Sequence, residues 1–107
     1  MRIEVLYFDG CPNQEALLSR LREMLARTGF SAEIHLRRIA SDEAAQRERF
    51  LGSPTVRING RDVEPEAERR TDYGLKCRLY RASTGLSGQP REELLQAALR
   101  SAAGAIG

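Results

Sequence analysis

The chain has 107 residues, enough for one domain with a modest core and too few for two. Hydrophobic residues make up 41% and charged residues 30%, and the net charge of +2 comes from interleaved basic and acidic side chains, which excludes a disordered chain and a basic nucleic-acid-binding patch. Neither a membrane-spanning apolar run nor a secretory leader pattern is present, so we expect a cytoplasmic protein with no nucleic-acid or membrane partner.

The first half of the chain alternates two predicted strands with two predicted helices. Residues 2–8 are rich in β-branched and aromatic side chains and predict a strand. Over residues 13–28 leucine and methionine recur at spacings of three and four, which predicts an amphipathic helix that ends at Gly29. Residues 31–39 alternate as in a strand with one covered face, and residues 41–50 begin with a serine N-cap and predict a short helix.

The clearest local signal in the sequence is Asn59-Gly60, which separates the strand-forming runs 55–58 and 61–63. This pair favours a type I′ turn, in which both central residues have positive φ, and it predicts a β-hairpin. Two parallel strands joined through a helix require a right-handed crossover, and the hairpin adds antiparallel strands. The expected fold class is therefore α/β, with a mixed four-stranded sheet and helices on both faces.

The remaining segments are less regular. Residues 65–74 are polar and predict a loop, whereas residues 75–82 fit either a strand or a helical turn. Residues 83–88 are rich in turn formers, and Pro90 then opens a final amphipathic helix. We expect a single domain over residues 1–102 and a flexible C-terminal tail over residues 103–107.

Cys11 is the leading candidate for a reactive residue. It follows the first predicted strand and an Asp9-Gly10 break, and Pro12 and a helix come directly after it. A thiol at the start of a helix lies near unpaired backbone N–H groups and the positive end of the helix dipole, and both favour the thiolate. We predict a nucleophile there, with a semi-buried apolar cysteine as the alternative. Asp9 would be a proton shuttle for this thiol or simply a turn residue.

Cys77 is the second cysteine. One interpretation is a resolving thiol that forms a disulfide with Cys11, with Lys76 and Arg78 favouring its ionisation; the other is a cysteine buried on the inner face of the last strand. Two cysteines and one histidine distant in sequence, His35, do not form a usual four-ligand zinc site. We therefore expect no metal and no other cofactor.

Cys11-Pro12 at the first strand-to-helix junction and Ser53-Pro54-Thr55 before the hairpin resemble, together with the order of elements, the thioredoxin fold over nearly the whole chain. The resemblance implies a three-layer βαβα-ββα sandwich. It also implies a cis Ser53–Pro54 bond beside the reactive cysteine and a Ser53 backbone that pairs with a bound peptide. The segment 53–55 would then form one wall of the substrate-binding site.

The chain departs from the thioredoxin motif at one position. Where that family has Cys-x-x-Cys, this chain has Cys11-Pro12-Asn13-Gln14, so a neighbouring thiol cannot release a mixed disulfide. The resemblance then implies monothiol chemistry, as in the single-cysteine glutaredoxins, on a protein or glutathione-like thiol or disulfide. Asn13 and Gln14 would donate to a bound thiol or oxyanion, or would be ordinary residues of the first helical turn.

Three segments, 7–13, 52–55 and 77–81, also resemble small bacterial thioredoxin-like proteins, some of which are labelled as similar to alkylmercury lyase. Three classes of function follow from these resemblances. The first, which we favour, is a thiol-dependent redox protein and possible thiol-disulfide oxidoreductase. The second is a soft-metal or organomercury thiol protein in which Cys11 and Cys77 act as a two-coordinate pair. The third is a non-catalytic thioredoxin-like binding domain.

Overall fold

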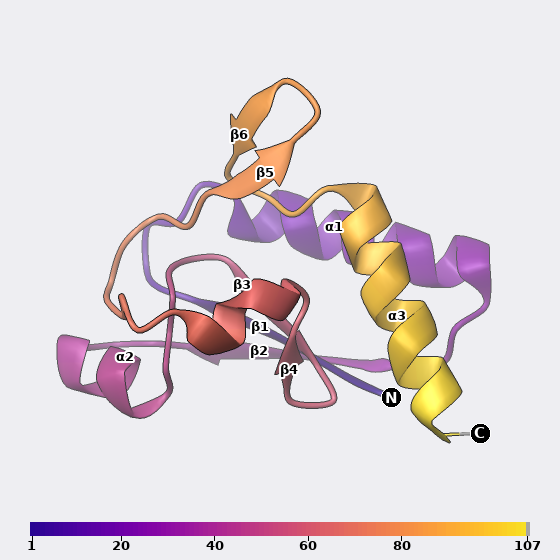
Figure 1. Cartoon of the computed structure of the whole chain (residues 1–107), viewed down its shortest axis with the longest axis horizontal. Helices are drawn as coiled ribbons and strands as arrows, with labels where there is room; N and C mark the ends of the chain where they lie inside the picture. Colours follow the sequence, from indigo (N-terminus) through magenta and orange to yellow (C-terminus); the bar gives the residue numbers. More distant parts are fainter. Residues whose placement is uncertain (107) are drawn as a thin grey trace.

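The computed structural model describes residues 1–106 (Figure 1). Helices and strands alternate in the first half of the chain, and short strands and a 3-10 helix dominate the second half. In chain order the elements are β1 (Arg2–Tyr7), α1 (Gln14–Thr28), β2 (Glu33–Arg38), α2 (Asp42–Arg47), β3 (Thr55–Ile58), β4 (Arg61–Asp62), the 3-10 helix η1 (Pro65–Arg69), β5 (Tyr80–Ala82), β6 (Gly85–Ser87) and α3 (Glu92–Ile106).

A mixed four-stranded sheet with the strand order β2-β1-β3-β4 forms the centre of the fold (Figure 1). The first two strands run parallel, with Ile3 opposite Ile34, and α1 connects them. β3 runs antiparallel to β1 and pairs in turn with β4. The mixed α/β sheet expected from the sequence is therefore confirmed.

Alternation along β1 sends its side chains to opposite faces of the sheet. Ile3 and Val5 are buried in the larger core cluster, which α1 supplies with Leu17, Leu21 and Met24 and α3 supplies with Leu95 and Leu99. Leu6 lies on the other face, where it packs with Ile39, Ala45 and Phe50 around the short helix α2. Helices thus cover both faces, and the side with α1 and α3 holds most of the core.

The predicted hairpin turn is also present. Asn59 has a φ of 52° and Gly60 a φ of 83°, the pair of positive values that a type I′ turn requires. The side chain of Asn59 accepts a hydrogen bond from the backbone N–H of Arg2 at 2.9 Å, which ties the turn to the start of β1. This turn aligns β3 with β4 and brings Arg57 opposite Asp62.

Four segments differ from the sequence prediction. α2 ends at Arg47, three residues early, and the polar segment expected to be a loop contains η1. The loop expected over residues 83–88 contains β6, because β5 offers a pairing partner that no local pattern reveals. α3 continues to Ile106 through an alanine-rich stretch with high helix propensity, so residues 103–106 are helical and not the predicted tail. Gly107, the last residue of that predicted tail, lies outside the described residues.

Candidate functional site

Cys11 lies in the turn between the central strand β1 and helix α1, as the sequence indicated. Its backbone N–H donates to the carbonyl oxygen of Phe8 at 3.3 Å, and its side chain is half-buried and free of any disulfide. α1 begins at Gln14, with Asn13 as its N-cap. Cys11 therefore lies two residues before the N-cap Asn13. Pro12, between the two, is exposed.

Asp9, the predicted proton shuttle, is exposed and forms an ion pair. Its carboxylate accepts a hydrogen bond from Nε of Arg38, at the end of β2, at 2.8 Å, and Nη2 of the same guanidinium lies 2.7 Å away in an ion pair. This pair links the turn that carries Cys11 to the neighbouring parallel strand. In this arrangement Asp9 acts first as a turn residue held by Arg38, and its role toward the thiol stays a prediction.

The start of α1 is in contact with the segment that follows β6. Figure 1 shows the β5–β6 hairpin beside the start of this helix. The side chain of Asn13 lies so close to Gly88 that a Cβ atom at position 88 would overlap it. Asn13 makes no capping hydrogen bond with its side chain, and Gln14 is half-buried as the first residue of the helix. Residues far apart in sequence thus pack around the Cys11 turn.

The Ser53–Pro54 peptide bond is cis, as the resemblance implied. All three residues of the segment 53–55 are buried, and Thr55 is the first residue of β3. The hydroxyl of Thr55 donates to the carbonyl oxygen of Gly52 at 2.6 Å, which closes a tight local turn. The expected wall is therefore a buried and internally bonded loop.

The backbone of Ser53 is already paired with the chain itself. Its N–H donates to the carbonyl oxygen of Lys76 at 2.8 Å, and its carbonyl accepts from the N–H of Arg78 at 3.0 Å. These two bonds form an isolated parallel bridge between Ser53 and Cys77. Cys77 itself is exposed and lies outside every named strand, so its predicted burial on the inner face of the last strand is wrong.

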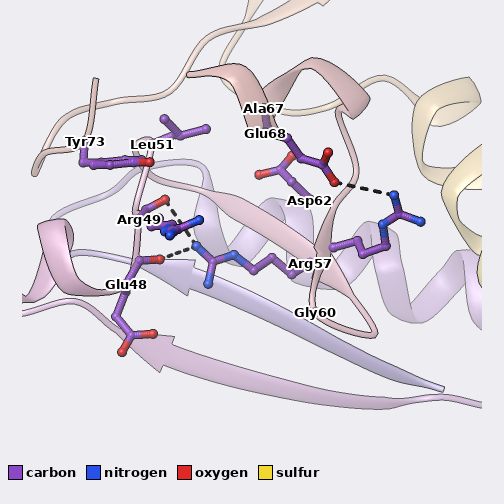
Figure 2. Close-up of a pocket in the computed structure, with 10 residues that line it drawn as sticks. Glu48, Arg49, Leu51, Arg57, Gly60, Asp62, Ala67, Glu68 and Tyr73 are labelled. Carbon is purple, nitrogen blue, oxygen red and sulfur yellow. Dashed lines mark hydrogen bonds and ion pairs between the residues drawn. The ribbon is translucent and has the colours of Figure 1, made fainter. Parts of the chain in front are cut away.

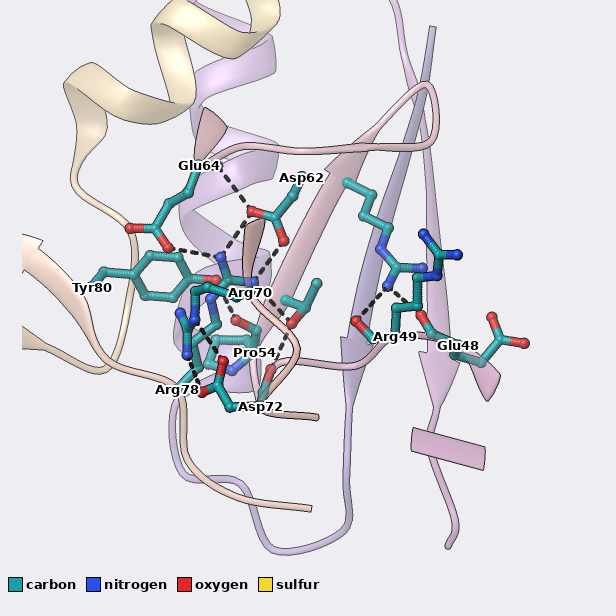
Figure 3. Close-up of polar contacts among 12 residues, drawn as sticks. Glu48, Arg49, Pro54, Asp62, Glu64, Arg70, Asp72, Arg78 and Tyr80 are labelled. Atoms are coloured by element: carbon teal, nitrogen blue, oxygen red, sulfur yellow. Dashed lines mark hydrogen bonds and ion pairs between the residues drawn. The ribbon is translucent and has the colours of Figure 1, made fainter. Parts of the chain in front are cut away.

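Arg78, the residue after Cys77, anchors this bridge through its side chain, whose contacts with Asp62 and Glu64 are drawn in Figure 3. Its side chain has no exposed surface, and its guanidinium donates to both oxygens of Asp62 at 2.7 and 2.8 Å and to Glu64 at 2.8 Å. Burial opposes the charge, but the hydrogen bonds and charges of these carboxylates outweigh it and raise the pKa of Arg78. Successive residues of an extended chain point in opposite directions, so Arg78 turns away from the exposed Cys77.

Tyr80 completes the contacts with the 53–55 loop. Its ring is fully buried, and the guanidinium carbon of Arg78 lies 4.5 Å from the ring centroid, within cation–π range. Its hydroxyl donates to the carbonyl oxygen of Pro54 at 2.6 Å. Burial raises the pKa of this hydroxyl well above its usual value.

Asp72 braces the exposed segment that leads to Cys77. Its carboxylate accepts hydrogen bonds from Arg70 at 2.6 and 2.9 Å and from Lys76 at 2.7 Å. The hydrogen bond from Arg70, followed by that from Lys76, holds the pKa of Asp72 well below its usual range. Lys76, expected to assist the ionisation of Cys77, is thus engaged by Asp72.

Two pockets lie elsewhere on the surface. One, of about 230 Å³, is lined by residues that include Arg57, Asp62 and Tyr73 (Figure 2). Burial lowers the pKa of Arg57 there, and its guanidinium donates to the carbonyl oxygen of Glu48 at 2.5 Å. The other, of about 430 Å³, lies between the β3–β4 hairpin and α3. Neither is lined by a cysteine or by the 53–55 loop.

Two residues organise this region, and sequence reasoning missed the role of each: Arg78, expected to assist the ionisation of Cys77, pairs with Asp62 and Glu64, and Tyr80 was not singled out. A local signal existed: apolar and polar residues alternate over residues 75–79, and two carboxylates follow the Asn59-Gly60 turn at positions 62 and 64. An arginine in such an alternating run, together with two acidic residues on one side of another extended segment, is compatible with a buried ion pair. The partners are 14 and 16 residues away, so no spacing rule connects them.

No protein-family model, curated protein or solved structure matches this chain. Within residues 1–106, no helix is long and apolar enough to cross a membrane, and no three His, Cys, Asp or Glu side chains are grouped so as to hold a metal ion. The class of protein that the described residues define is therefore a mixed α/β domain with two free cysteines. One cysteine lies at a strand-to-helix turn and the other lies across a backbone bridge from Ser53.

Proposed function

We propose that this protein is a thioredoxin-like thiol–disulfide exchange protein whose nucleophile is Cys11. The observation that carries the proposal is the position of Cys11. It is a free, half-buried cysteine in the turn that joins the central strand of a mixed sheet to the first helix. Such a cysteine is held by two rigid elements and still reaches solvent. These are the conditions that a thiol nucleophile requires.

Three further features support the proposal. The mixed four-stranded sheet has α1 and α3 on one face and α2 on the other, which is compatible with the three-layer sandwich that the resemblance implies. Ser53 and Pro54 lie in a buried loop fixed by Tyr80 and Arg78. Cys77 is exposed and free, so a second thiol is available for exchange.

In the proposed reaction the Cys11 thiolate attacks one sulfur of a disulfide RS–SR. A Cys11–S–S–R bond forms, the RS–SR bond breaks, and RS⁻ leaves and takes up a proton. A second thiol then attacks the mixed disulfide. When that thiol is Cys77, it attacks the Cys11 sulfur, so a Cys11–Cys77 disulfide forms and the second RSH is released. When it is an external thiol R′SH, it attacks the R sulfur, so R–S–S–R′ forms and the Cys11 thiolate is regenerated.

The test is disulfide reduction by the purified full chain with an excess of an external thiol, compared with the Cys11→Ser and Cys77→Ser variants. The proposal expects Cys11→Ser to reduce no faster than the external thiol alone. Cys77→Ser distinguishes the two release steps, because it slows turnover only if Cys77 resolves the mixed disulfide. Full activity of Cys11→Ser would refute the proposal.

A further inference from the structure

The backbone of Ser53 offers an N–H and a carbonyl that an extended peptide would pair with, as peptides do when they add to an exposed strand edge. In this chain both groups are occupied by residues 76 and 78. We call this pair of groups the Ser53 edge and residues 74–79 the strap. The strap occupies the position that a peptide added to the Ser53 edge would take.

The strap is fixed at its start. The N–H of Gly74 donates to the carbonyl oxygen of Phe50 at 3.0 Å, and the carbonyl of Tyr73, just before the strap, accepts from the side chain of Gln46 at 3.2 Å. The donor Gln46 lies in the last turn of α2, and the acceptor Phe50 lies between α2 and β3. The strap is therefore anchored before it reaches the Ser53 edge.

The strap is fixed more firmly at its end. Removing Arg78 from its site would leave the carboxylates of Asp62 and Glu64 without their partner and expose a guanidinium that now has no exposed surface. Breaking a buried ion pair from one side is strongly unfavourable. Gly52 adds a close fit, because a Cβ there would lie 3.0 Å from the carbonyl oxygen of Lys76 and from the Cβ of Arg78. A competing peptide would have to displace all of these contacts.

We infer that the strap permanently occupies the Ser53 edge and that Cys11 therefore takes its disulfides from low-molecular-weight compounds, not from extended polypeptide segments. This inference rests on the proposed thiol–disulfide exchange. A small disulfide RS–SR needs only access to the half-buried Cys11 sulfur. The Cys11–S–S–R bond forms, the RS–SR bond breaks, and one RSH is released, with no backbone pairing required.

The test compares two disulfides with the reduced Cys77→Ser variant, in which mass spectrometry follows only the adduct on Cys11. One is bis(2-hydroxyethyl) disulfide, and the other is the symmetrical disulfide of a blocked Val-Cys-Val peptide. Each rate is divided by the rate of free N-acetylcysteine with the same disulfide. We expect the small disulfide to be favoured by at least about tenfold, because the residues that flank the peptide's cysteine meet the strap and gain no backbone hydrogen bonds to offset the cost of ordering them.

A peptide rate equal to or above that of the small disulfide would overturn the inference and leave the proposed exchange intact. If neither disulfide reacted faster with Cys11 than with free N-acetylcysteine, the proposed exchange would fail and the inference with it. Amide hydrogen exchange of the unmodified chain gives a second measurement. The Ser53 and Arg78 amides should exchange more slowly than that of Cys77, whose N–H has no hydrogen-bond acceptor within residues 1–106. Equal exchange at all three amides would overturn the inference, because the strap would then be open.

Discussion

Tyr80 donates its phenolic hydroxyl to the carbonyl oxygen of Pro54 at 2.6 Å, and both residues are buried. The contact joins the first residue of β5 to the loop before β3, so it links the two-stranded hairpin to the main sheet. Arg78 lies over the same ring and bonds the hydroxyl of Thr55 at 3.1 Å. The position of the 53–55 loop is therefore determined by a segment more than twenty residues later in the chain (Figure 3).

The first prediction concerns this hydrogen bond. Tyr80→Phe removes the donor and leaves the buried Pro54 carbonyl without it, so we expect a loss of about 1–3 kcal/mol in the free energy of unfolding. Urea denaturation measures the loss. Tyr73→Phe is the matched control, because Tyr73 is only half-buried and lines the pocket of Figure 2. Equal effects of the two changes would contradict the role of the Tyr80 hydroxyl.

The second prediction concerns alkaline pH. Burial raises the pKa of Tyr80 in the folded protein. When the pH exceeds the usual tyrosine pKa of about 10, the Tyr80 hydroxyl therefore loses its proton in the unfolded chain and keeps it in the folded chain. This contribution to stability is complete below about pH 10 and falls by about 1.4 kcal/mol per pH unit above it. Urea denaturation between pH 9.5 and 11.5 should show a shallower decline for Tyr80→Phe than for the unaltered protein. Parallel profiles would contradict the assignment.

The third prediction concerns the buried guanidinium. Arg78→Met leaves Asp62 and Glu64 without their shared partner, and we expect a loss of about 3–5 kcal/mol in the free energy of unfolding. Arg81→Met is the control, because Arg81 is exposed and its removal should change stability by no more than about 0.5 kcal/mol. A similar small loss in both variants would show that Arg78 is not the anchor described here.

The fourth prediction concerns the contact between Asn13 and Gly88. Gly88→Ala places a methyl group where the Asn13 side chain lies, so it should destabilise the fold by about 1–3 kcal/mol through overpacking. In the Asn13→Ala background the same change should cost less, since the overlapping amide is gone. A double-mutant cycle in thermal denaturation measures the difference. Additive effects would mean that the two residues do not share this contact.

The sequence predicts those parts of the fold that are determined by residues close together in the chain. The leucine and methionine spacing of α1, the serine cap of α2 and the Asn59-Gly60 turn each act within a few residues, and all three elements are present. Cys11 was placed correctly between β1 and α1 because both flanking elements were recognisable. That the Ser53-Pro54-Thr55 segment forms a wall of the Cys11 site stays a prediction.

The parts that the sequence did not predict depend on contacts between distant residues. β6 is a three-residue strand that exists only because β5 pairs with it, and neither has a strong pattern of its own. Cys77 was ambiguous for the same reason, since its exposure follows from the bridge to Ser53 and the burial of Arg78. Such pairings depend on the register of tertiary contacts, which periodicity along one segment does not encode.

The most direct test of the central claim measures how fast Cys11 reacts in the folded protein relative to the unfolded chain. The Cys77→Ser variant is treated with bis(2-hydroxyethyl) disulfide at pH 7, in buffer and in concentrated urea, and mass spectrometry follows the adduct on Cys11. The account predicts faster reaction in the folded state, because the turn before α1 holds the thiol ready for attack. Reaction in the folded state that is equal to or slower than in urea would contradict it.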